Sequence, residues 1–175
     1  MMVDLGCGPH KRAEIGLDCV PGPGVDVVCW AGFEPLPFAD ASVQGFVAYD
    51  FLEHLPVAVW ERVVDRTGPE AERVTVRVHR PRIYLLREIY RCLVPGGVFE
   101  SVTPVEYPEW AQDPTHEAPP WTEATWDYFC GGRPEVPTAH YGIDVRFELL
   151  LRERVGPQGH HLRVIVRKPA PIETP

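Results

Sequence analysis

The stretch that decides the fold of this chain is Val3-Asp4-Leu5-Gly6-Cys7-Gly8. An apolar strand runs directly into a Gly-x-Gly turn, in which two closely spaced glycines allow the backbone to turn sharply. Such a turn leaves no side chain between the main chain and a ligand, and its N–H groups suit an anionic or hydroxyl-rich group. The same pattern also occurs as an ordinary tight turn, so the rest of the sequence has to decide between the two interpretations.

Length and composition indicate one globular domain. The chain has 175 residues, of which 45% are hydrophobic, enough to bury a single core. No apolar run approaches the roughly 20 residues of a membrane-spanning helix, and the N-terminus lacks the pattern of a signal peptide. The five cysteines include no Cys-x-x-Cys pair, which argues against a disulfide framework and a structural zinc site. We therefore expect a cytoplasmic protein with reduced thiols and no membrane contact, acting as a monomer or homodimer.

The charge pattern argues against nucleic acid as a partner. The formal net charge is −8, whereas a protein that binds nucleic acid usually carries a basic stripe that neutralises phosphates. The basic residues between positions 62 and 91 are interspersed with acids instead of forming such a stripe.

Further stretches follow the first one at characteristic spacing. They are Ile15-Gly16-Leu17-Asp18, an apolar run ending in an acid; Leu36-Pro37-Phe38-Ala39-Asp40; Phe46 to Leu55, which ends in Leu-Glu-His-Leu; and Leu86 to Gly97. In this order and spacing the chain resembles small class I S-adenosylmethionine-dependent methyltransferases, over roughly residues 3–55 and 83–167. The Asp-Pro-Thr-His segment at residues 113–116 is similar to one in a largely uncharacterised branch of these enzymes.

The resemblance implies an α/β fold, a Rossmann-like three-layer sandwich with a mostly parallel seven-stranded sheet and one antiparallel strand. From the sequence we expect strands at 2–6, 15–18, 25–29, 45–49, 98–103, 143–151 and 161–166, and helices at 57–66, 82–94 and from the Thr122 cap through Cys130. The alternation of Val74, Val76 and Val78 predicts an edge strand. Residues 9–14 are too few for a full crossover helix.

We expect a single methyltransferase domain over residues 1–168, followed by a tail at 169–175. Within it, residues 67–80 form an insertion without a counterpart in the resemblance. Residues 104–142 hold seven prolines and seven aromatic residues, and long ordered loops of this kind are frequently functional. This segment is therefore predicted to be a lid over the acceptor.

The resemblance implies S-adenosylmethionine as the cofactor. The backbone of Gly6, Cys7 and Gly8 would lie against the methionine portion, and Asp4 would order the turn or reach the ammonium group through water. Asp18 would accept two hydrogen bonds from the ribose diol; a solvated acid at the end of a strand is the plainer interpretation.

Further cofactor contacts are expected from the loops after the third and fourth strands. Leu36 would border the adenine, and Tyr49 and His54 would face the cofactor, although His54 could also be a structural histidine. Trp30 stands where close relatives often have an acid, so it would either stack on the adenine or belong to the core. Because the first strand begins at residue 2, either the start is truncated or the pocket is more open than in most members.

The predicted catalytic pair is His116 and Asp113. A hydroxyl acceptor has to lose its proton as the methyl group arrives, and histidine titrates in the appropriate range. The alternative is that His116 bonds a backbone carbonyl and holds the lid in place. A metal site formed by Asp113, His116 and His140 is conceivable, but their spacing is not diagnostic, so no metal is predicted.

The resulting hypothesis is methyl transfer to a small-molecule or glycan-like acceptor, in which the protein contributes mainly positioning and desolvation. One alternative is a protein that binds S-adenosylmethionine with lost or weak transfer activity, favoured by His10 in place of the third glycine of the motif. A nucleic-acid methyltransferase is a second alternative, opposed by the acidic balance. A nicotinamide-dependent oxidoreductase is a third, but Lys11 interrupts the Gly-x-Gly-x-x-Gly pattern that it requires.

Overall fold

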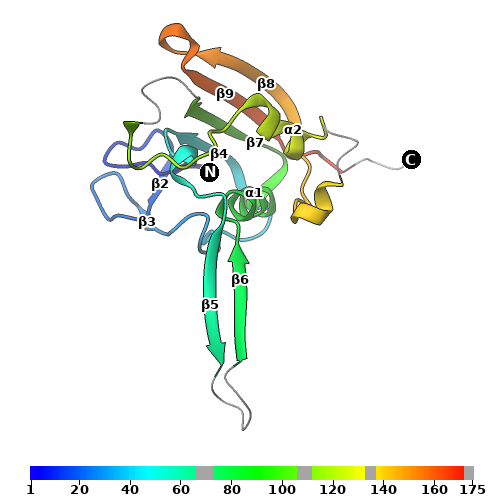
Figure 1. Cartoon of the computed structure of the whole chain (residues 1–175). Helices are drawn as coiled ribbons and strands as arrows, with labels where there is room; N and C mark the ends of the chain where they lie inside the picture. Colours follow the sequence, from blue (N-terminus) through cyan, green and yellow to red (C-terminus); the bar gives the residue numbers. More distant parts are fainter. Residues whose placement is uncertain (66–72, 106–111, 133–136, 172–175) are drawn as a thin grey trace.

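The computed structural model describes residues 1–65, 73–105, 112–132 and 137–171. Its main sheet has seven strands in the order β3-β2-β1-β4-β7-β9-β8 (Figure 1). The strands are β1 (Met2–Leu5), β2 (Ile15–Asp18), β3 (Val27–Val28), β4 (Val43–Tyr49), β7 (Leu93–Pro104), β8 (Glu148–Val155) and β9 (His161–Arg167). Only β9 runs antiparallel to its neighbours among these described strands. The expected mostly parallel sheet with one antiparallel strand is thereby confirmed.

Helices flank this sheet. They are α1 (Pro81–Cys92) and α2 (Glu123–Cys130), accompanied by the short 3-10 helices η1 (Leu52–His54), η3 (Thr138–Tyr141) and η4 (Pro157–Gly159). The expected α2 is confirmed: Thr122 and Thr125 form a reciprocal capping box at its start, and Gly131 ends it in the left-handed conformation. None of the helices in the described residues is both long enough and apolar enough to cross a bilayer.

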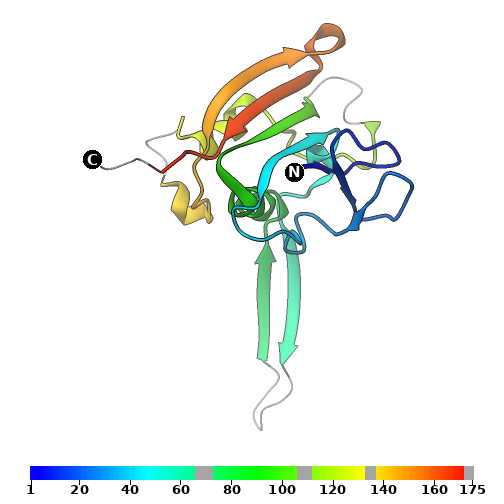
Figure 2. The ribbon, with the colours of Figure 1, turned by 180° about the vertical axis from the view of Figure 1, so that it is seen from behind.

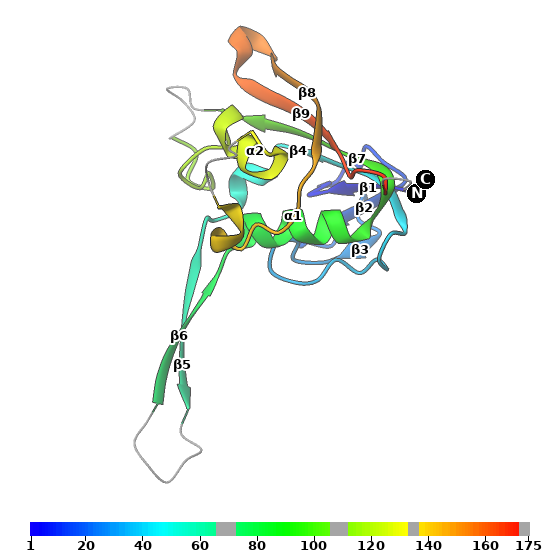
Figure 3. The ribbon, with the colours of Figure 1, turned by 90° about the vertical axis from the view of Figure 1, so that its right-hand side faces the viewer.

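The core lies between the sheet and these two helices. In Figure 1 α2 is in front of the strands and in Figure 2 it is behind them, while in Figure 3 α1 runs below the strands. Phe46 and Phe99 are register partners on β4 and β7, and both are fully buried. The ring of Phe99 packs 6.1 Å from that of Trp126 on α2, while Leu86 and its neighbours on α1 fill the adjoining space. The central strands therefore pack their apolar face against the helices.

Three expected strand boundaries differ most from the structure. The third strand is only Val27–Val28, the strand expected at 98–103 begins earlier, at Leu93, and the strand expected at 143–151 begins later, at Glu148. Ile143 and Phe147 are buried, but their N–H groups donate to the carbonyl oxygens of Thr138 and Phe129, within the connection that packs near α2. The apolar residues that alternate in this segment are therefore buried as part of a loop, and at its start they do not form a strand. As expected, the described residues 9–14 contain no helix.

An arm projects from the body of the molecule in all three ribbon views (Figures 1, 2 and 3). It consists of β5 (Val59–Asp65) and β6 (Arg73–His79), which pair antiparallel. The helix expected at 57–66 is wrong, because cross-strand pairing such as Trp60 with Val78 favours the extended backbone that β-branched valines prefer. The strand expected around Val76 is confirmed. Residues 67–72 of the predicted insertion lie outside the described residues, as do Tyr107 and Trp110 of the predicted lid.

The arm offers a first testable prediction, on Trp60. Its side chain is 69% exposed on β5, so it contributes little buried apolar area to the folded monomer. We expect Trp60→Ala to change the free energy of unfolding by no more than about 0.5 kcal/mol, measured by urea denaturation at low protein concentration. A loss above about 1.5 kcal/mol would contradict the prediction, because it would mean that Trp60 is buried against another surface.

Candidate functional site

A cavity of about 380 Å³ opens at the carboxyl ends of β1, β2 and β4. The strand order reverses between β1 and β4, and open α/β sheets bind their ligands at this kind of switch point. Its lining comprises Gly6, Leu17, Asp18, Cys19, Cys29, Trp30, Ala31, Phe33, Asp50, Phe51, His54 and Leu55. Of the eight predicted cofactor residues, Gly6, Asp18 and His54 line the cavity.

The glycine turn is built by close packing as well as by its backbone shape. Gly6 has φ = +65°, and a Cβ atom added there would overlap the ring of Phe51. The N–H group of Gly6 donates to the carbonyl oxygen of Leu17 over 2.8 Å, which joins the turn to β2. Phe51, which the sequence analysis missed, therefore forms the wall of the cavity beside the turn.

The carboxylate of Asp18 organises two backbone segments at the edge of the cavity. Oδ2 accepts a hydrogen bond from Gly8 N at 3.0 Å, and Oδ1 accepts one from Val20 N at 3.0 Å. A carboxylate offers about four acceptor positions, so each oxygen retains capacity for a hydroxyl donor from a ligand. Asp18 is thus fixed in place and still able to accept from a bound diol.

Asp4 and Cys7 lie behind the turn, not in the lining of the cavity. Oδ2 of the buried Asp4 accepts from Arg12 N at 2.6 Å, while Oδ1 is buried without a hydrogen-bond partner among the described residues. Burial raises the pKa of Asp4. Burial likewise raises the pKa of the Cys7 thiol, whose sulfur lies 3.4 Å from the carbonyl oxygen of Gly24. Both side chains therefore support the turn from within.

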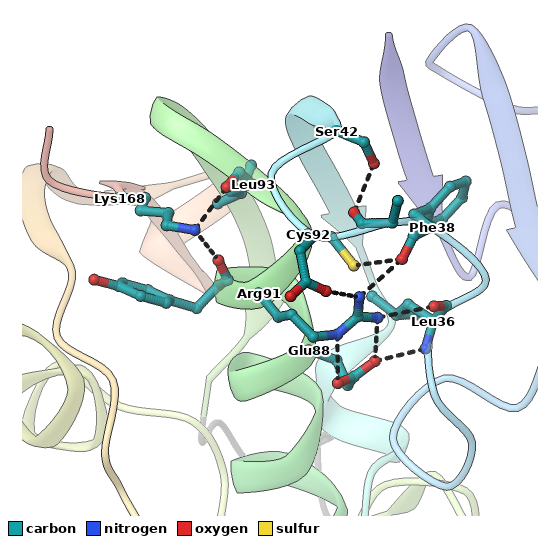
Figure 4. Close-up of polar contacts among 11 residues, drawn as sticks. Leu36, Phe38, Ser42, Glu88, Arg91, Cys92, Leu93 and Lys168 are labelled. Carbon is teal, nitrogen blue, oxygen red and sulfur yellow. Dashed lines mark hydrogen bonds and ion pairs between the residues drawn. The ribbon is translucent and has the colours of Figure 1, made fainter.

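Leu36 is held in the core by a polar network at the end of α1 (Figure 4). Its side chain is 2% exposed and does not line the cavity. Its N–H group donates to Glu88 over 2.9 Å, and its carbonyl oxygen accepts from Arg91 at 3.0 Å. Arg91 also donates to the carbonyl oxygen of Phe38, and its hydrogen bonds lower the pKa of Glu88. These contacts fasten the loop to α1.

Tyr49 points into a separate charged cluster. Its hydroxyl donates to Glu100 over 2.9 Å, and Arg163 donates to the same carboxylate oxygen. Arg12 lies over the ring, 4.9 Å from its centroid, and burial raises the pKa of the phenol. Tyr49 is absent from the residues that line the cavity.

Two aromatic side chains form the rim of the cavity. Trp30 is 56% exposed and Phe33 is 41% exposed, and their rings meet edge to face with centroids 6.3 Å apart. The core interpretation of Trp30 is therefore wrong, whereas stacking on a ligand remains open to it. Phe33 was not predicted as a site residue, because nothing near it in the sequence except Trp30, three residues earlier, indicates a contact with a ligand.

A cluster of titratable side chains adjoins the cavity at η1. Nε2 of His54 lies 3.8 Å from Oε1 of Glu53, and the rings of His54 and His116 are 5.4 Å apart. Asp113 Oδ2 is 3.6 Å from Nε2 of His116. Burial raises the pKa of Glu53 to about 8, while hydrogen bonds from Thr115 lower the pKa of Asp113. The two predicted catalytic residues are thus brought together, and their catalytic role stays a prediction.

The segment that carries His116 is tied to η1 by the buried side chain of Arg82. The three guanidinium nitrogens donate to the carbonyl oxygens of Leu55, Glu117 and Pro119 over 2.6–2.8 Å. Burial lowers the pKa of Arg82 to about 10. Trp121 adds a hydrogen bond from Nε1 to the carbonyl oxygen of Leu52. This part of the predicted lid is therefore anchored to the body of the protein.

A second depression, of about 690 Å³, lies between the starts of α1 and α2. Among the described residues it is lined mainly by apolar and aromatic side chains, such as Ile83, Tyr128 and Tyr141, and by no acid. None of the predicted cofactor or catalytic residues lines it. The first cavity is therefore the better candidate for the functional site.

Comparison with known proteins gives matches to solved structures. No family model matches the sequence, and no curated protein matches it. The chain is similar to a putative methyltransferase solved in complex with the Trm112 activator from Haloferax volcanii, with 14% identity and a TM-score of 0.57, covering 99% of this chain and 83% of that chain. A SAM-dependent methyltransferase from Methanosarcina mazei gives 16% identity and a TM-score of 0.55, over 97% and 92% of the two chains.

A third similar structure contains a cofactor product. It is the 1,6-didemethyltoxoflavin-N1-methyltransferase of Burkholderia thailandensis, solved with 1,6-didemethyltoxoflavin and S-adenosylhomocysteine, at 16% identity and a TM-score of 0.52, over 96% of this chain and 70% of that chain. At these identities the similarity concerns the fold. The chain therefore has the Rossmann-like fold found in SAM-dependent methyltransferases.

Proposed function

We propose that this protein binds S-adenosylmethionine in the 380 Å³ cavity and transfers a methyl group to a small-molecule or glycan-like acceptor. The observation that carries the proposal is the position of Asp18, whose carboxylate lies in that cavity at the carboxyl end of β2, beside the glycine turn. A carboxylate in this place of a doubly wound sheet is suited to accept from a ribose diol.

The residues present fit such a cofactor. Small-ligand pockets have volumes of about 300–1,000 Å³, with mostly apolar walls and a few polar groups, and the cavity of about 380 Å³ meets this description. Trp30, Phe33 and Leu55 would hold the flat base, and Asp18 would hold the ribose. Gly6 would bring the backbone close to the amino-acid portion.

The protein's part in the reaction would be to position and desolvate the reacting groups. When bound, S-adenosylmethionine supplies a methyl group that is already activated by a sulfonium sulfur. The aromatic rim of Trp30 and Phe33 would exclude water from the cavity, and the clamp formed by Arg82 would fix the segment that carries His116. Holding the reactants in register in this way can supply much of the rate acceleration.

The acceptor class is proposed from charge and from the shape of the site. A net charge of −8 disfavours a polyanionic acceptor, and the polar groups at the edge of the cavity, His54 and His116, suit a neutral, hydroxyl-bearing molecule. Similar structures support small-molecule chemistry only as a precedent, since one of them was solved with 1,6-didemethyltoxoflavin.

Calorimetric titration with S-adenosylmethionine and S-adenosylhomocysteine tests the proposal, with NADH as the negative control. In the same titrations, we expect Asp18→Ala to weaken binding by about 1–3 kcal/mol, roughly a 5- to 150-fold rise in Kd, through loss of a charge-assisted hydrogen bond. Glu148→Ala is the control, because Glu148 pairs with Arg167 and does not line the cavity. An unchanged Kd for Asp18→Ala would remove this residue from the site.

A second candidate function is binding of the cofactor without transfer, and the packing of Phe51 favours it. The ring of Phe51 lies against Gly6 and Gly8 N already donates to Asp18, which leaves less of the turn available to a ligand. Micromolar binding with no methyl transfer across a screen of hydroxyl, amine and thiol acceptors would support this alternative. Turnover of any acceptor would reject it.

A further inference from the structure

Glu53, His54 and His116 bring one ligand atom each to within 4.8 Å of one another. Glu53 and His54 belong to η1, whereas His116 comes from the segment after β7 and is 9% exposed. Oxygen and imidazole nitrogen atoms converge here from two separate parts of the chain. A cluster of this kind differs from the acidic surface groups that occur on most proteins.

The carboxyl group of Glu53 is buried and incompletely hydrogen-bonded. Its side chain is 1% exposed, and Oε2 is buried without a hydrogen-bond partner among the described residues. The other oxygen is 3.8 Å from His54 Nε2, which is longer than a hydrogen bond. Leaving a buried polar atom unpaired is costly, and such atoms in native proteins commonly mark a functional group or an ion that belongs there.

The environment of His54 fixes its tautomer in the form that a metal requires. Nδ1 lies 3.1 Å from the carbonyl oxygen of Thr115, which can only accept, so Nδ1 carries the proton. The lone pair of the neutral ring is then on Nε2, the atom on the side of Glu53. Histidines that bind metals usually donate their other N–H group to a carbonyl in this way.

The backbone holds the two ligand-bearing segments together. Glu117 N donates to the carbonyl oxygen of Glu53 over 2.8 Å, and Arg82 bridges Leu55 and Glu117. These bonds set the distance between η1 and the residue that precedes Glu117. The fold therefore holds the two ligand-bearing segments next to each other.

We propose that Glu53, His54 and His116 bind a divalent first-row transition-metal ion at the edge of the 380 Å³ cavity. Two imidazoles and one carboxylate form the donor set of catalytic zinc sites, which keep an open position, and of iron and manganese sites. Magnesium and calcium prefer oxygen ligands alone. In this proposal His116 binds the metal ion, whereas the sequence predicted that it accepts a proton from the acceptor molecule.

The open position would face a molecule in the cavity, since His54 is part of the lining. A metal there could bind an oxygen of that molecule. The inference itself does not rest on the proposed methyl transfer, because metal binding can be measured with no cofactor present.

The test is titration of the chelator-stripped protein, carrying no histidine tag, with Zn²⁺ by calorimetry and with Co²⁺ by visible absorption. We expect one ion per chain, with the intense Co²⁺ absorption of a four- or five-coordinate site, and no comparable binding of Mg²⁺. Glu53→Gln and His116→Gln should each raise the Kd for Zn²⁺ at least about 100-fold.

His140→Gln is the matched control. His140 lies in η3 and is not part of the cluster, so this variant should bind Zn²⁺ as the parent does. Thermal unfolding of each variant shows whether it is folded, and His54→Gln replaces any variant that is not. Equal Zn²⁺ affinity in the parent and the ligand variants, no binding by the parent, or loss of binding in His140→Gln would each overturn the proposal. S-adenosylmethionine is titrated into the same samples in a separate experiment. The proposed metal site and the proposed cofactor site are therefore tested independently of each other.

Discussion

Gly6→Ala is expected to weaken cofactor binding and to lower the stability of the fold. At φ = +65°, a side chain costs about 1–2 kcal/mol of backbone strain. The added methyl group would also overlap the ring of Phe51, and overpacking of this kind costs a further 1–3 kcal/mol or so. Because Phe51 lines the cavity, relief of the overlap moves its ring into the space for the ligand. We expect at least a tenfold or so rise in Kd for S-adenosylmethionine, measured by calorimetry alongside urea unfolding.

Gly96→Ala separates the two contributions. Gly96 has φ = +80° and nothing within 4 Å of the position of an added Cβ atom, so this substitution adds backbone strain without a clash. We expect it to lose about 1–2 kcal/mol of stability and to keep the parental Kd. The losses of stability caused by Gly6→Ala and Phe51→Ala should be less than additive in the double variant, because the overlap is removed there. Equal effects of Gly6→Ala and Gly96→Ala would show that Phe51 does not constrain the turn.

Arg82→Met is expected to lower the free energy of unfolding by about 3–4 kcal/mol. The buried guanidinium donates to three backbone carbonyls. Its removal leaves these carbonyl oxygens without their donors, and a buried acceptor left unsatisfied costs about 1–3 kcal/mol. Amide exchange at Glu117, whose N–H group donates to Glu53, should accelerate as the segment loosens. Urea unfolding and hydrogen exchange measure the two effects.

Arg80→Met is the control for this prediction. Arg80 is exposed and precedes α1, so its replacement should change stability by no more than about 0.5 kcal/mol. Arg82→Lys should restore only part of the loss, because an ammonium group cannot span three carbonyls in the planar geometry of a guanidinium. A loss below about 1 kcal/mol for Arg82→Met would mean that the segment is held mainly by other contacts, such as that of Trp121 with Leu52.

Local patterns predicted the features that local interactions determine. The Gly-x-Gly turn after an apolar strand located the cavity, since the carboxyl ends of parallel strands meet at one edge of the sheet. Thr122 and Gly131 predicted both ends of α2, because caps act within a single turn of helix. Asp18 was placed in the cavity for the same reason, as the last residue of its strand.

Several predictions were wrong where contacts with residues distant in sequence determine the position of a side chain or the backbone conformation. Leu36 and Tyr49 were expected to face the cofactor, but Glu88 and Glu100 draw them into other contacts. The helix expected at 57–66 is a strand, because its backbone pairs with residues 73–79. Neither the pairing nor the charged partners can be read from the residues on either side of these positions.

The sequence by itself determined the approximate positions of most strands and of the turn beside the cavity, because apolar periodicity and turn chemistry act over a few residues. The single antiparallel strand was implied by the resemblance of the sequence to a family. Only the tertiary structure decided that Phe51 lies against Gly6, that Arg82 clamps the segment after β7, and that Glu53, His54 and His116 converge. These contacts join residues far apart in the chain. Their geometry follows from how the layers pack, which no local pattern encodes.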